Sequence, residues 1–126
     1  MNFKVRTALV AGGVLSAAPL LWGHHGLARF DTTHTITIQG TVTDFQWSNP
    51  HVYMYANVKD EKGQVVNWKL EMGSPGMLSR FGGWNPKTVK QGDLVTVTGF
   101  RAKDGSAYMS PVEIVLPDGK KMSAAP

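Results

Sequence analysis

From residue 35 onward, apolar and polar residues alternate with a period of two, and short segments rich in glycine, proline and aspartate separate the alternating stretches. Successive side chains of a β-strand point to opposite faces, so this period predicts strands that each bury one face. The chain is therefore expected to be mainly β. The alternating stretches lie at 35–47, 51–58, 65–72, 94–100 and 107–116.

The first stretch is long, and its pattern changes phase. From Ile36 to Val42 the apolar residues are at even positions, whereas Phe45 and Trp47 are at odd positions, which places them on the opposite face of the strand. Gly40 interrupts the first apolar face. A glycine inside a strand is typical of a bend or a bulge. One long, bent strand explains both features.

One short helix is expected between the third and fourth strands. Ser74 followed by Pro75 is a helix-start signal, an N-cap and then a first-turn proline, and Gly82 or Gly83 can end the helix about two turns later. A long bent first strand with a helix after strand three is the layout of a five-stranded Greek-key barrel of the OB type. A plain meander or a small sandwich is the alternative.

The first 23 residues have the pattern of a secretory signal peptide. Lys4 and Arg6 precede an uncharged, largely apolar run, and Gly23 is a small residue at a suitable cleavage position. An uncleaved anchor is the alternative, but the run is shorter than the ~20 apolar residues of a membrane span. We therefore expect export to the periplasm and no stable membrane association after cleavage. The predicted organisation is a signal at 1–23, a leader at 24–34, the barrel at 35–122 and a disordered tail at 123–126.

Charge and composition narrow the function classes. The chain has 13 Lys and Arg against 9 Asp and Glu, and two of the basic residues lie in the signal. The mature charge is therefore nearly balanced, which argues against nucleic acid as a partner. The absence of cysteine excludes disulfides, thiol catalysis and cysteine metal sites. No paired carboxylates or nucleophile–histidine–acid set stands out, so an enzyme is not expected.

Cleavage at Gly23 would give the mature chain a free amine beside the imidazole of His24. An amine and an imidazole nitrogen are ligands that copper(II) accepts, and His51 is the predicted third ligand. His25 could replace either histidine, and Glu71 could orient a histidine or take an axial position. The competing interpretation is a leader whose histidines have no structural partner, with His51 only capping a strand.

A second hypothesis uses the outer face of the second and third strands, where OB-folds hold their ligands. The candidate ligand-binding residues on that face are Tyr53, Tyr55, Asn57, Lys69 and Glu71, which could contact a small ligand such as an oligosaccharide, or an unknown periplasmic protein. The chain would then be a non-catalytic docking module. Alternatively, the face is ordinary solvent-facing sheet, because tyrosine is a good strand former.

Several short motifs point to a known family. The segments "HHGLARFD", "WSNPH", "GSP", "AKDGS" and "VLPDGKK" together resemble domain-of-unknown-function family 6152, a group of small exported bacterial proteins. The resemblance covers essentially all of the mature chain. It implies export and a compact β-barrel, and it supplies no activity or ligand. Members commonly have two histidines, a small residue and a Phe-Asp pair after the signal, which match His24, His25, Phe30 and Asp31; Gly26 stands where many have serine.

Overall fold

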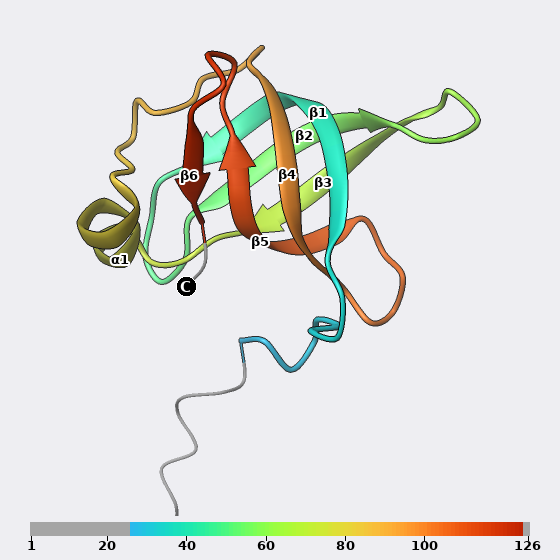
Figure 1. The fold of residues 1–126 in the computed structure, drawn as a ribbon, viewed down its shortest axis with the longest axis horizontal. Coiled ribbons are helices and arrows are strands. Elements are labelled where there is room, and N and C mark those ends of the chain that lie inside the picture. Colours follow the sequence, from blue (N-terminus) through green and yellow to red (C-terminus); the bar gives the residue numbers. More distant parts are fainter. Residues whose placement is uncertain (1–25, 125–126) are drawn as a thin grey trace, which may run out of the picture.

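The computed structural model describes residues 26–124, and Figure 1 shows them as a strongly curved sheet with a short helical segment at one end. The expected strands are present in the expected order. The elements are β1 (Ile36–Gln46), β2 (Tyr53–Lys59), β3 (Val65–Glu71), α1 (Pro75–Met77) with the π-helical turn η1 (Leu78–Gly82), β4 (Leu94–Arg101), β5 (Tyr108–Val115) and β6 (Lys121–Ser123). No helix among the described residues is long and apolar enough to cross a membrane.

The strands form one sheet in the order β3-β2-β1-β4-β5-β6, in which all neighbours are antiparallel. A parallel contact between β3 and β5, at Lys69–Tyr108 and Leu70–Met109, then joins the two ends of the five-stranded part. This contact closes β1 to β5 into a barrel (Figure 1). The predicted OB-like barrel, with its helix between strands three and four, is confirmed.

The bend predicted in the first strand is a change of pairing partner. β1 pairs with β4 from Ile36 to Thr41 and with β2 from Thr41 to Gln46. A register shift between Val42 and Asp44 accompanies the change, and it explains why the apolar phase slips after residue 42. Gly40 lies at the turning point, where an added Cβ would come within 2.7 Å of the backbone oxygen of Asn57.

The barrel interior is filled by side chains of the apolar phase from every long strand. Its fully buried members include Val42, Met54, Leu70, Val97, Met109 and Ile114. The helical segment covers one end of this core. Trp84, which is 2% exposed, packs there, and its indole Nε1–H donates to the backbone oxygen of Ser123 at 2.7 Å. Removing this apolar area from water stabilises the fold by about 25 cal/mol per Å².

The expected start of the C-terminal tail is wrong. The tail expected at 123–126 is ordered through residue 124, because Ser123 pairs with Glu113 in β6 and Ala124 is fully buried. The backbone N–H of Ala124 also donates to the oxygen of Val112 at 2.9 Å. Three residues are too few to show an alternating pattern, so sequence periodicity could not reveal this strand.

The predicted leader at 24–34 also has a structural partner. Phe30 is only 2% exposed and forms an isolated antiparallel bridge with Ala102. The N–H of Asp31 donates to the oxygen of Arg101 at 2.9 Å, and the N–H of Lys103 donates to the oxygen of Arg29 at 2.9 Å. These bonds satisfy backbone groups at the end of β4, so this short segment is fixed on the barrel. The predicted signal peptide and its cleavage position at Gly23 lie outside the described residues.

Gly99 of β4 gives a direct test of the close approach between β4 and β5. An added Cβ would overlap the backbone oxygen of Ser110 and lie 2.7 Å from Cα of Pro111. We expect Gly99→Ala to lower the free energy of unfolding by about 2 kcal/mol, the usual effect of overpacking. Urea denaturation measures this change. Gly76→Ala is the matched control, since a Cβ at Gly76 meets nothing within 4 Å; equal stability of the two variants would contradict the argument.

Candidate functional site

The register of β2 and β3 brings the predicted ligand-binding residues to one face. Three cross-strand pairs share the outer face of the sheet: Tyr53 with Glu71, Tyr55 with Lys69, and Asn57 with Asn67. The tyrosines, Lys69 and Glu71 are half-buried, whereas the two asparagines are exposed. We call these six residues the β2–β3 face.

At the end of this face formed by Asn57 and Asn67, the side chains hydrogen-bond within the protein. The side-chain amide of Asn67 donates to Oδ1 of Asn57 at 2.9 Å and to Oγ1 of Thr43 at 3.0 Å. Both donor hydrogens of the Asn67 amide are therefore used within the protein. The oxygen of Asn57 and the hydroxyl of Thr43 accept from Asn67 without any ligand.

Lys69, in the middle pair of the face, contacts two residues that the sequence did not suggest, Tyr108 and Arg29. Nζ of Lys69 lies 4.5 Å from the ring centre of Tyr53 and 5.2 Å from that of Tyr108. Arg29 approaches the same tyrosine, with Cζ 5.9 Å from the ring centre of Tyr108 and Nη1 donating to its hydroxyl at 3.4 Å. Tyr108 reaches Lys69 through the parallel β3–β5 contact. Tyr108 becomes a neighbour of Lys69 only where the barrel closes, and the alternation of residues along the strands does not predict that contact.

His51 lies beyond Tyr53 and Glu71, at the opposite end of the face from the asparagines, just before β2 and directly after the cis peptide bond between Asn49 and Pro50. Its Nδ1 lies 3.0 Å from the backbone oxygen of Met72. A carbonyl oxygen only accepts, so Nδ1 carries the hydrogen and donates, which leaves Nε2 as the free nitrogen of a neutral ring. Nε2 is 3.8 Å from Oε1 of Glu71, and the His51 side chain is 34% exposed.

Glu71 is the one acidic group of the face, and its carboxylate is only partly satisfied. Its side chain is 11% exposed, and Oε2 is buried with no hydrogen-bond partner among the described residues. Leaving a buried carboxylate oxygen without a donor costs free energy. A cation or a donor group of a ligand would remove that cost.

The predicted histidines fall into three groups. His51 faces Glu71. His34 lies before β1, where its Nδ1 is 3.3 Å from Oδ2 of Asp31 and 3.2 Å from Oγ1 of Thr33. His24 and His25 lie outside the described residues. Within residues 26–124, no group of three or more histidine, aspartate and glutamate side chains could hold a metal ion.

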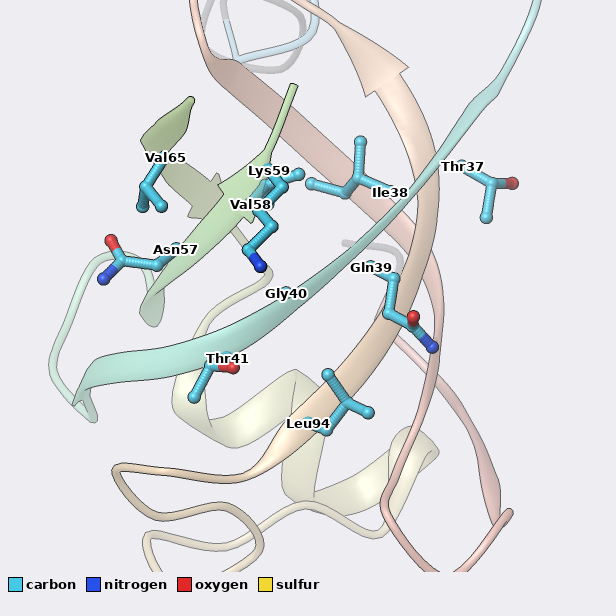
Figure 2. Close-up of a pocket in the computed structure, with 10 residues that line it drawn as sticks. All are labelled: Thr37, Ile38, Gln39, Gly40, Thr41, Asn57, Val58, Lys59, Val65 and Leu94. Carbon is cyan, nitrogen blue, oxygen red and sulfur yellow. The ribbon is translucent and has the colours of Figure 1, made fainter. Parts of the chain in front are cut away.

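An open groove of about 640 Å³ lies elsewhere on the barrel, where β1 leaves β2 to pair with β4. Figure 2 shows Ile38 and Gly40 of β1 on one side of it and Val58 and Val65 of the hairpin on the other. Of the residues predicted for a site, only Asn57 lines this groove.

Burial raises the pKa of the Tyr53 hydroxyl above its ordinary value of 10.0, and the charge of Glu71 raises it further. Removing that charge should bring the pKa back toward the ordinary value. We expect Glu71→Gln to lower the Tyr53 pKa, while burial still holds it above 10.0. A pH titration of ¹³Cζ-labelled tyrosine followed by NMR measures it by residue. Tyr108 is the internal control, and an unchanged Tyr53 pKa in Glu71→Gln would contradict the assignment.

A model of the family of unknown function DUF6152 matches residues 11–110. Among curated proteins, none matches the sequence. The crystal structure of the mitochondrial single-stranded DNA binding protein Rim1 from S. cerevisiae is similar, at 17% sequence identity and a TM-score of 0.44. The match covers 65% of this chain and 92% of Rim1.

Proposed function

The chain belongs to DUF6152, a family of unknown function, and we propose that it is an exported, non-catalytic binding protein that holds a copper ion. In this proposal the signal peptide is removed after Gly23, and the mature protein works in the periplasm. The copper ligands are the amine and imidazole of His24 together with Nε2 of His51. His25 is the alternate histidine.

The observation that supports this proposal is the orientation of His51. Its Nδ1–H donates to the backbone oxygen of Met72 at 3.0 Å, so Nε2, which lies 3.8 Å from Oε1 of Glu71, is the nitrogen left for a metal. Histidines that bind metals commonly donate their other nitrogen to a carbonyl in this way, which fixes the tautomer and the ring orientation.

Glu71 adds a second reason. Its Oε1 lies 3.8 Å from Nε2 of His51, and its buried Oε2 lacks a hydrogen-bond partner within residues 26–124. A divalent cation beside Nε2 would be attracted by this carboxylate, which could either take an axial position or orient the imidazole. His51 and Glu71 supply two donors at most, so the proposal requires the histidine at the mature N-terminus to complete the site.

Copper titration of the mature protein, beginning at His24, tests this function. We expect one Cu(II) per chain by calorimetry, with a nitrogen-rich signal in electron paramagnetic resonance. His51→Ala should weaken copper binding at least tenfold, because it removes the imidazole whose orientation is fixed by the backbone oxygen of Met72. Acetylation of the His24 amine should also abolish tight binding, because it removes that nitrogen as a copper ligand.

His34→Ala is the matched control for this titration, since His34 is an exposed histidine bonded to Asp31. It should bind copper like the wild type. If His51→Ala and His34→Ala bind copper equally well, the protein does not use the proposed site.

A second candidate function is docking of a small ligand, such as an oligosaccharide, or of a periplasmic protein on the β2–β3 face. The observation that favours it is the position of Lys69, whose Nζ lies between the rings of Tyr53 and Tyr108. Half-buried aromatic rings around a cation offer both stacking area and charge to a partner. The nearly balanced mature charge argues against nucleic acid as that partner.

The double variant Tyr53→Ala with Tyr55→Ala tests the second function. It removes both rings from β2, so we expect a ligand identified from a soluble oligosaccharide panel, or a partner captured from periplasmic extract, to lose most of its binding. Copper binding should be unchanged in this variant. The control is Asn57→Ala combined with Asn67→Ala, at the end of the face where the side chains bond to each other. An equal loss of ligand binding in this control would contradict the placement of the ligand at Tyr53 and Tyr55.

A further inference from the structure

We propose that the seam between β3 and β5 carries a subsite for a small oxyanion, a carboxylate or a phosphate group, held between Lys69 and Arg29. The proposal rests on the second candidate function, ligand binding on the β2–β3 face, and names the chemical class of the ligand. It does not depend on copper.

Three segments that are distant in the sequence meet at this point. Lys69 comes from β3, Tyr108 from β5, and Arg29 from the N-terminal segment that is fixed to the barrel through Phe30 and Asp31. Both cations converge on one ring, with Nζ of Lys69 5.2 Å and Cζ of Arg29 5.9 Å from the ring centre of Tyr108.

The two cations have no anion of their own. Neither Lys69 nor Arg29 forms an ion pair within 4.0 Å of a carboxylate in the described part of the chain. Glu71 is two residues from Lys69 on the same strand face, but its Oε1 lies against His51 at 3.8 Å. Two positive groups at one ring repel each other, and the rings compensate for this only through cation–π attraction. An anion between them would relieve the repulsion.

The hydrogen-bond donors at the seam also fit an oxyanion. The guanidinium of Arg29 offers paired N–H groups that match a carboxylate or phosphate edge, and Lys69 adds a compact positive charge. The hydroxyl of Tyr108 accepts a hydrogen bond from Nη1 of Arg29 at 3.4 Å, so its own proton is available to donate. Lys69 and Tyr108 are half-buried, and partial exclusion of water strengthens charge-assisted bonds of this kind.

The size of the cluster limits the ligand. Two cations neutralise one or two negative charges, which suits a single carboxylate or phosphate group. A nucleic acid strand, by contrast, is tracked by an extended row of cations. The neighbouring ring of Tyr53, 4.5 Å from Nζ of Lys69, would contact the remainder of the ligand on the β2–β3 face.

The test is a titration of the mature protein with inorganic phosphate and, separately, with acetate. The ionic strength is held constant, so that screening by salt is the same at every point. Two-dimensional NMR follows the amides of Lys69 and Tyr108. We expect saturable shifts at these amides with at least one of the two anions. Lys69→Gln and Arg29→Gln should each raise the dissociation constant about tenfold or more, as expected for loss of one charge-assisted bond.

Two variants make the comparison specific. Lys62→Gln removes an exposed lysine from the β2–β3 turn and should leave the dissociation constant within about twofold of wild type. Lys69→Arg keeps the charge and should retain most of the binding. Far-UV circular dichroism confirms that each variant is folded.

The outcomes separate the subsite from the wider function. Binding of acetate alone or of phosphate alone supports the subsite and identifies which anion it prefers. Shifts that are equal in Lys69→Gln and Lys62→Gln, or that do not saturate with either anion, overturn it. In that case, binding of a neutral oligosaccharide that depends on Tyr53 and Tyr55 leaves the second candidate function standing. If no ligand binds to the face, both the subsite and the second candidate function are wrong.

Discussion

The fold depends on β1 pairing with two different strands along its length. Its first half is bonded to β4 and its second half to β2, so a single strand connects the two halves of the sheet. This requires close approach of the backbones at the turning point, which only a residue without a Cβ permits at Gly40. Because β1 curves, the sheet ends come together and β3 meets β5. The core, the helical cap and the outer face all follow from that closure.

Closure also decides which residues meet at the surface. The parallel β3–β5 contact spans only two residue pairs, yet one of them places Tyr108 beside Lys69. The end of β4 then leaves backbone groups that the segment around Phe30 satisfies, and this brings Arg29 to the same tyrosine. The cation–aromatic cluster is therefore a consequence of how the barrel closes, and no single strand contains it.

The sequence predicted the elements well, because each long strand has one buried and one open face, and this produces a readable period. The same alternation placed Tyr53, Tyr55, Lys69 and Glu71 on one face, and the register confirms that placement. It could not place Tyr108 or Arg29, since contacts across a closing seam depend on strand order and leave no periodic signal. The fixed position of Phe30 was missed for a similar reason: an isolated bridge has no pattern.

The two ends of the β2–β3 face differ in how their polar groups are satisfied. Asn67 donates to both Asn57 and Thr43, so a ligand that used the Asn67 amide would have to break an existing bond. At the other end, the buried Oε2 of Glu71 lacks a donor, and Lys69 lacks a carboxylate within ion-pair distance in the described chain. A ligand bound at that end would gain interactions without first displacing internal ones. This difference between the two ends is the reason that both proposed ligands are placed near His51, Glu71 and the seam.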